Sequence, residues 1–351
     1  MAVFITGLGN ISPQKWEGAA LLSDPQNYEG ERLFCVEPDY SQYIDVRQLR
    51  RMSRILKMGV SAGSMALREA GLAVPDGIIT GTGYGCLEDT GSFLSKMISN
   101  KEIALNPTPF IQSTHNTIGS QIALLLTCQG YNQTYTQRAF SFENAILDAL
   151  LELRERPDQS LMVGGVDEIT DTSHAILRRF GIFRSASTQS LSLFDSEADG
   201  TINGEGATYC ILSGQQNQSA NVCVDSVATF YQPNIQTVTD GIGQFLKTAG
   251  LSLDDMDMVL LGKSGDRRLD KSCEFISSKL FKSNSIGRFK HLSGEYPTAT
   301  AFAVYLAARI IKEQMIPKVV MERDLGRRPD NILIYNIYFG SYHSLILLRH
   351  A

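Results

Sequence analysis

The sequence has no long hydrophobic run. Its longest apolar stretches, such as 122–126 and 344–348, are far shorter than the roughly 20 residues that a membrane helix needs, so we expect no membrane span. Met1 leads directly into an apolar strand-like pattern, with no basic segment before it and no small-residue cleavage site after it. We therefore expect a cytoplasmic protein.

The sequence also lacks paired cysteines and a basic surplus. Six cysteines are scattered without a CxxC pair, which argues against a zinc site or a disulfide framework and predicts buried thiols. With 32 basic and 37 acidic residues the formal net charge is -5, which argues against nucleic acid as a main partner. No metal or cofactor is expected.

The composition is that of a folded globular protein. Of the 351 residues 43% are apolar and 20% charged, which excludes disordered and low-complexity classes. Short β-branched runs alternate with helical patterns in the first half. They predict strands at 2–6, 77–81, 132–136 and 160–163, the last ending at Gly164 and Gly165, and helices at 46–70, 117–126 and 141–154.

A polar run at 213–219 interrupts this pattern, which then restarts. The second half predicts strands at 222–228 and 258–261, helices at 237–249, 270–280 and 298–315, and a closing hairpin of 332–337 with 344–348. The βαβ order predicts an α/β fold with a mostly parallel sheet. Two similar halves, 1–215 and 216–351, suggest an internal duplication.

Two glycine-rich segments invite a ligand-binding interpretation. Gly7 and Gly9 follow the first strand but lack a full phosphate-loop pattern, so we expect a tight turn there. In the segment 194–207, Asp195, Asp199 and Glu205 lack the regular spacing of a calcium loop. We expect these carboxylates to accept hydrogen bonds from loop amides.

Seven segments along the chain match one known family in its order. They are VFITGLGNISP, RRMSRILKMGVSAGSMALREAGL, GTGYGCLED, NPTPFIQSTHNTIGSQIAL, LMVGGVDE, FDSEADGTINGEGA and YFGSYHSLILL. The chain thereby resembles the β-ketoacyl synthases of the thiolase-like fold. The resemblance implies a five-layered α/β/α/β/α fold with two similar halves, each with a sheet, and helices between the sheets.

Active members of this family use a cysteine as acyl acceptor and two histidines for decarboxylation of the malonyl extender. A thiolate at a helix N-terminus and donors aimed at an oxyanion are what this chemistry needs. Counting back 25 residues from Gly164 places the nucleophile position at Ala139. The histidine positions correspond to Ser264, or Lys263 if the register slips by one, and to Glu295.

The Lys-x-x-x-Gly-His pattern of the second histidine keeps its lysine as Lys290, while His291 stands four residues early. With all three catalytic side chains replaced, the chain resembles a non-catalytic chain length factor. Such a subunit pairs with an active β-ketoacyl synthase as a heterodimer and meets the acyl carrier protein through that complex. The usual polyketide factor carries Gln where this chain has Ala139, and the chain is short, which favours an aryl-polyene system over an aromatic polyketide one.

By the same resemblance, the segment after the Asn-Pro turn reaches over the dimer axis toward the partner's acyl tunnel, and the strand at 132–136 forms the dimer edge. The tunnel and interface candidates are Phe110, Ile111, Gln112, Ser113, Thr114 and His115. The same residues could merely pack a core loop. The segment 339–342 stands at the family's glycine-rich gate but has lost most of its glycines, so we expect no moving gate.

Two alternatives remain open at this point. A stand-alone acyltransferase or condensing enzyme could use a relocated nucleophile such as Ser141, Cys86 or Cys128, although no motif places a histidine beside one. The second alternative is a protein with a purely structural role that forms a homodimer.

The basic row Arg47, Arg50, Arg51, Arg54 and Lys57 has helical spacing and would either meet an acidic carrier protein or form a solvated face.

Overall fold

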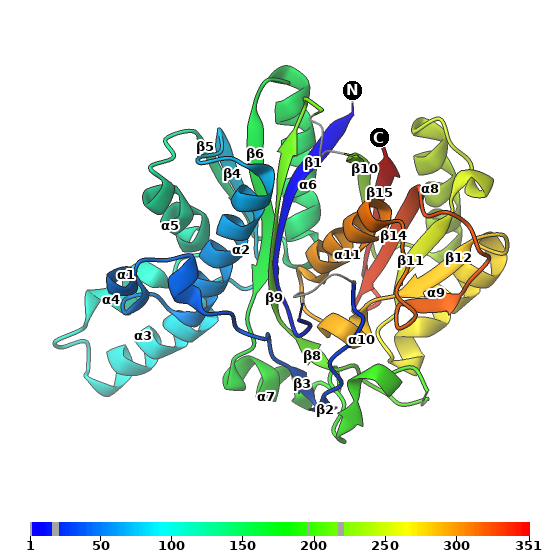
Figure 1. Ribbon diagram of the computed structural model, residues 1–351. Helices are drawn as coiled ribbons and strands as arrows, with labels where there is room; N and C mark the ends of the chain where they lie inside the picture. The colour runs from blue at the N-terminus through cyan, green and yellow to red at the C-terminus, as the bar shows by residue number, and fades with distance from the viewer. Residues whose placement is uncertain (1, 16–20, 196, 217–220) are drawn as a thin grey trace.

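The computed structural model describes residues 2–15, 21–195, 197–216 and 221–351, and eleven strands of this part form one hydrogen-bonded sheet (Figure 1). The strands of the first half lie in the order β1 (Val3–Ile11), β9 (Gly206–Ser213), β6 (Ser160–Asp167), β4 (Gly77–Gly81) and β5 (Tyr131–Tyr135). Those of the second half lie in the order β10 (Val222–Tyr231), β15 (Tyr342–His350), β14 (Asn331–Tyr338), β11 (Met258–Gly262), β12 (Ser285–Arg288) and β13 (Met321–Arg323).

The strand directions of the first five strands recur in the second half. In the first half, β1, β9 and β6 are antiparallel neighbours, and β6, β4 and β5 are parallel ones. In the second half, β10, β15 and β14 are antiparallel in the same way, and β14, β11 and β12 are parallel. Among the described strands, the two groups pair with each other where Val3 and Phe4 meet Val224 and Cys223. We propose that this correspondence reflects a duplication with its boundary near residue 215.

Helices form three further layers around and between the two groups of strands (Figure 1). α2 (Arg54–Ala70) and α5 (Thr117–Leu126) cover the outer face of the first half, and α8 (Ile235–Thr248) and α9 (Arg267–Leu280) cover that of the second. α6 (Ser141–Glu155) and α11 (Ala299–Glu313) lie between the halves and contact strands of both. The five-layered fold expected from the sequence is confirmed. The expectation of a mostly parallel sheet is wrong, because six of its ten strand pairs are antiparallel.

The remaining elements are short or lie at the periphery. They are α1 (Val46–Leu49), α3 (Leu87–Ser99), α4 (Pro107–Gln112), α7 (Asp171–Arg179), α10 (Lys290–Ser293), the paired strands β2 (Glu29–Gly30) with β7 (Thr188–Gln189), and β3 (Arg32–Leu33) with β8 (Asn203–Gly204). Single 3-10 turns occupy Tyr40–Gln42, Arg138–Phe140, Ser190–Ser192 and Leu253–Asp255.

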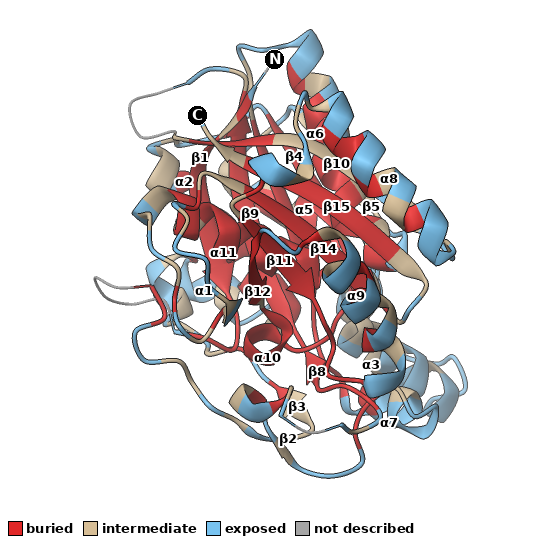
Figure 2. Cartoon of the chain, turned by 90° about the vertical axis from the view of Figure 1, so that its right-hand side faces the viewer, coloured by how far each residue is buried: buried red, intermediate tan, exposed pale blue. Residues whose placement is uncertain are grey.

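Side-chain alternation along the strands explains the layers. Successive strand residues face opposite sides of a sheet. Ile79 faces the central core while Ile78 packs under α2, and Leu260 faces the centre while Val259 packs under α8 and α9. Figure 2 shows the result, with the strands and α11 buried and the outer helices exposed on one side only. α11 is buried along most of its length because strands of both halves contact it.

Two glycine-rich strands run on where the sequence predicted an end. β1 continues through Gly7 and Gly9 instead of turning, because α2 approaches too closely for any side chain: a Cβ on Gly9 would lie 1.9 Å from the Ala62 carbonyl oxygen. β6 likewise continues past Gly164 and Gly165 to Asp167. These glycines serve close packing of layers.

The helix predicted at 46–70 is two helices. α1 ends at Leu49 and α2 begins at Arg54, after Met52 has turned into the core. The basic row therefore does not lie on one helical face, and Arg54 forms ion pairs with Glu37 and Glu205. Part of the polar run at 213–219 lies outside the described residues.

Candidate functional site

Ala139 lies at the sharp connection between the edge strand β5 and helix α6. Arg138 before it has φ of +53°, a region that side chains other than glycine and asparagine rarely adopt, and α6 begins two residues later. The Ala139 methyl group is buried at the positive end of the helix dipole. A thiol here would be activated by the dipole, but a methyl group offers no nucleophile.

Ser264 follows strand β11, and both its amide and its hydroxyl group are hydrogen-bonded to the carboxylate of Asp270. Its amide and its hydroxyl donate to Asp270 Oδ1 at 2.8 and 3.0 Å, and the Gly265 amide donates to Oδ2 at 2.7 Å. Asp270 thus fixes the loop, and burial raises its pKa. Lys263 pairs instead with Glu274 at 3.1 Å.

Glu295 forms a buried ion pair with Lys290. The Lys290 ammonium donates to Glu295 Oε2 at 2.8 Å and to the Ile337 carbonyl oxygen at 2.7 Å. Burial raises the pKa of Glu295 to about 7, against the opposing charge of Lys290. His291 points elsewhere and donates to the Val319 carbonyl oxygen at 2.9 Å, while burial lowers its pKa to about 4.

Glu143 is a site residue that the sequence did not reveal. It lies one turn after Ala139 on α6, where Ser344 donates to its Oε1 at 2.8 Å. Burial raises its pKa to about 7, opposed in part by the nearby charge of Lys290. The sequence feature that could have revealed Glu143 is an acidic residue next to Phe142, within a helix face that is otherwise apolar.

A very small cavity lies beside Glu295. Its lining includes Tyr84, Asp167, Glu295 and Tyr338, and its volume of about 10 Å³ holds no more than a water molecule. Asp167 accepts hydrogen bonds from the amides of Gly83 and Thr298, at 2.9 and 3.1 Å. Burial raises the pKa of Asp167 to about 6. This carboxylate ties the loop after β4 to the start of α11.

The alternative nucleophiles lack an activating base. Ser141 Oγ donates to the carbonyl oxygens of Arg138 and Thr82 at 2.6 and 2.9 Å, and no histidine among the described residues contacts it. Burial raises the pKa of the Cys86 thiol. Five cysteines are buried as expected, but Cys128 is only half-buried, which corrects the expectation for that residue.

The acidic segment before β9 has structural contacts. Glu205 accepts from the amides of Cys35 and Ile169 at 2.8 and 3.0 Å, and Asp199 pairs with Arg267 at 2.8 Å. Across the described part of the chain, no three side chains of His, Cys, Asp or Glu come together as a metal site would require.

The tunnel candidates lie apart from these buried groups, on and after the short helix α4 (Figure 1). Phe110 and Ile111 are 56% and 64% exposed, so they do not pack a core loop within this chain. The Gln112 side-chain amide donates to the Arg51 carbonyl oxygen at 2.5 Å, and the Ser113 hydroxyl donates to the Phe110 carbonyl oxygen at 2.7 Å. The Thr114 and Thr117 hydroxyl oxygens lie 2.8 Å apart. The His115 ring packs against Gly85.

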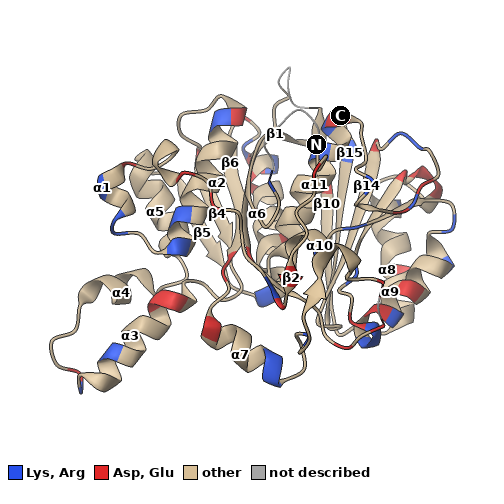
Figure 3. Cartoon of the chain, turned by 60° about the horizontal axis from the view of Figure 1, so that its bottom comes forward, with Lys and Arg blue, Asp and Glu red and all other residues tan. Residues whose placement is uncertain are grey.

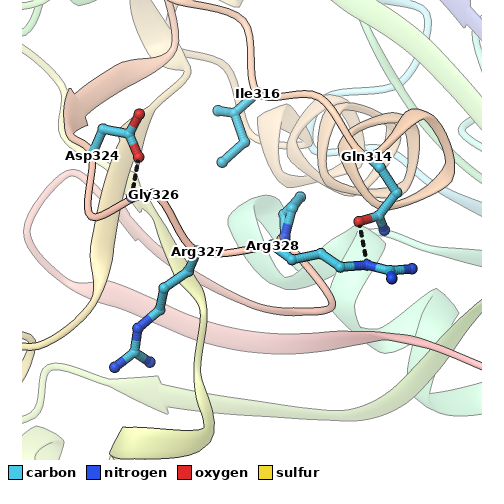
Figure 4. A pocket seen from close by; sticks show the side chains of 7 residues that line it. Gln314, Ile316, Asp324, Gly326, Arg327 and Arg328 are labelled. Atoms are coloured by element: carbon cyan, nitrogen blue, oxygen red, sulfur yellow. Dashed lines mark hydrogen bonds between the residues drawn. The ribbon is translucent and has the colours of Figure 1, made fainter.

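Other surface features do not involve the predicted positions. A groove of about 670 Å³ lies by the loop 324–329, where Arg328 donates to Gln314 Oε1 (Figure 4). Charged side chains are distributed over both halves, for example on α1, α3, α7 and α9 (Figure 3).

Within the described ranges, no helix has the length and apolar character that a bilayer span requires.

Comparison with known proteins gives one family. The model of the β-ketoacyl synthase N-terminal domain matches residues 6–218. The 3-oxoacyl-(acyl-carrier-protein) synthase 2 of Synechocystis sp. is 25% identical over 239 residues, which cover 60% of this chain and 57% of that protein. Nodulation protein E of Rhizobium sp. strain N33 is 20% identical, with 91% of this chain and 87% of that protein covered.

Solved structures share the fold over the whole chain. A structure described as the ishigamide ketosynthase/chain length factor matches with a TM-score of 0.82 at 17% identity, covering 100% of this chain and 99% of that one. A ketosynthase in complex with its chain length factor from Xenorhabdus doucetiae matches with a TM-score of 0.76 at 14% identity, covering 100% and 98%.

Proposed function

Because this chain belongs to the β-ketoacyl synthase family, we propose that it is a non-catalytic subunit of the chain length factor type. The observation that carries the proposal is Ala139, a buried methyl group at the helix N-terminus where the family resemblance puts the acyl-accepting cysteine. Ser264 and Glu295, at the positions of the two histidines, are engaged by Asp270 and Lys290. Neither side chain is free to stabilise an enolate.

The proposed partner is an active β-ketoacyl synthase. Among the strands that the structure describes, β5 stands at the end of the sheet, and such an edge can pair with a strand of another chain. The exposed apolar residues Phe110 and Ile111 on α4 would complete the partner's acyl tunnel. The proposed role is to set where the growing chain stops.

The pathway assignment is an extension of this proposal. We favour an aryl-polyene-like system, in the cytoplasm, with the acyl carrier protein delivering substrate to the complex. Two of the structural relatives come from pairs of a ketosynthase and a chain length factor, which supports a heterodimer.

Co-expression with candidate ketosynthases, followed by affinity purification and sizing, tests the proposal. A stable complex containing one copy of each chain is expected. A stable homodimer that ignores every ketosynthase would favour the structural alternative. An acyl adduct on this chain would favour the stand-alone enzyme.

A further inference from the structure

Aromatic side chains gather around Tyr342, at the turn between β14 and β15. The Tyr342 ring lies 5.0 Å from that of Phe140, 5.1 Å from that of Tyr231 and 6.1 Å from that of Tyr338, each edge to face. These separations are those of favourable aromatic contacts. We call Phe140, Tyr231, Tyr338 and Tyr342 the aromatic cluster.

The aromatic cluster connects two parts of the candidate site. Phe140 is the residue directly after Ala139. Tyr338 lines the cavity of about 10 Å³ beside Glu295, and its hydroxyl lies 3.3 Å from that of Tyr84. The rings of Phe140, Tyr342 and Tyr338 thus follow one another in contact from the residue after Ala139 to the cavity at Glu295, with Phe140 and Tyr342 half-buried and Tyr338 buried.

The backbone holds Tyr342 in this place. Tyr338 and Tyr342 are paired residues of the β14–β15 hairpin, and the Ser341 amide donates to the Tyr338 carbonyl oxygen at 3.2 Å. From the neighbouring strand, the Gln232 amide donates to the Ser341 carbonyl oxygen at 2.7 Å. The turn is thus bound both within the hairpin and to β10.

We propose that Tyr342, packed among the aromatic cluster, is a steric plug that closes this chain's own acyl site. The plug is a second barrier, independent of the missing nucleophile: a cysteine at position 139 would still meet aromatic rings where an acyl chain has to lie. Rings packed edge to face leave no room between them for a chain of methylenes, which would have to displace them. The proposal rests on the proposed function, which assigns Ala139 to the nucleophile position.

Alkylation of an introduced cysteine tests the plug. The isolated chain is prepared as A139C, A139C/Y342G and A139C/Y342F, and each is treated with iodoacetamide and with an iodoacetamide that carries an octyl chain. Peptide mass mapping follows the modification of residue 139 separately from the native cysteines. Each variant is first checked for cooperative thermal unfolding, and A139C/Y342S replaces A139C/Y342G if the glycine variant does not fold.

The plug predicts that the octyl reagent modifies A139C/Y342G at least about tenfold faster than A139C. A139C/Y342F, which keeps the ring, should react as slowly as A139C. Equal rates for A139C and A139C/Y342G with the octyl reagent would overturn the proposal. That outcome would leave the non-catalytic assignment intact, because the assignment is tested by the partner and by acylation of the natural chain.

Discussion

Lys290 and Glu295 form an ion pair inside the protein, with 2.8 Å between the ammonium nitrogen and Glu295 Oε2 and neither side chain open to solvent. The single turn of α10 and the left-handed Gly294 bring the two residues together. A pair of this kind is costly to break, because removal of one partner leaves an uncompensated buried charge. The position that the family resemblance gives to a catalytic histidine thus has a structural role here.

Glu295→Ala should lower the free energy of unfolding by about 3 to 5 kcal/mol, because Lys290 would remain buried without its counter-charge. Urea unfolding of the purified chain measures the loss. Glu274→Ala is the matched control: Glu274 also pairs with a lysine but is 59% exposed, so its loss should cost less than about 1 kcal/mol. Similar losses in both variants would contradict a buried, energetically coupled pair.

Stability should fall as the pH rises from about 4.5 to about 7. Burial raises the pKa of Glu143 from 4.5 to about 7, so the folded chain retains on this carboxyl group a proton that the unfolded chain has lost in this window. The contribution is fully present below pH 4.5 and is lost as the pH passes 7. Urea unfolding at a series of pH values follows this decline.

Glu143→Gln should flatten the decline by at most about 3 kcal/mol, since the amide does not titrate. Glu274→Gln changes an exposed carboxyl group instead and serves as the control. An unchanged pH profile in Glu143→Gln would show that Glu143 does not titrate in this range.

Gly9→Ala should destabilise the chain by about 1 to 3 kcal/mol or more, because its Cβ would lie 1.9 Å from the Ala62 carbonyl oxygen and force α2 away from β1. Gly243→Ala adds the same methyl group to α8 where nothing lies within 4 Å, and should be neutral or stabilising through helix propensity. Thermal unfolding compares the two. Equal stability of both variants would rule out the close contact between β1 and α2.

Phe110→Ala and Ile111→Ala should lengthen the products of the complex with the partner ketosynthase, since smaller side chains would leave more room at the tunnel end. Both residues are exposed in this chain, so its own stability should change little. Mass spectrometry of the released products gives the chain length. Phe180→Ala removes a ring that is even more exposed, at 75%, from the end of α7 and is the control. Unchanged products from an assembled complex would exclude this role.

The sequence predicted the order of the elements because hydrophobic periodicity is a local property. β4 at 77–81 and α5 at 117–126 have the predicted bounds, since apolar patterns and turn residues delimit them clearly. The break between α1 and α2 was not predicted, because the periodicity continues across it. The glycines of β1 were misinterpreted because their reason, the approach of α2, is a tertiary contact.

The candidate site was predictable only in part. The family resemblance assigned Ala139, Ser264 and Glu295 to the catalytic positions, but the contacts around them come from elsewhere in the fold. Asp270 comes from α9, and Ser344, the partner of the unpredicted Glu143, comes from β15. The aromatic cluster joins residues as distant as Phe140 and Tyr342. Such convergence depends on the layered packing, which no local pattern encodes.

The most direct test of the account is intact-mass analysis of both chains after the co-purified complex has been incubated with an acyl carrier protein substrate. We predict an acyl adduct on the partner ketosynthase and none on this chain, because Ala139 offers no nucleophile. A stable acyl adduct on any residue of this chain would contradict it.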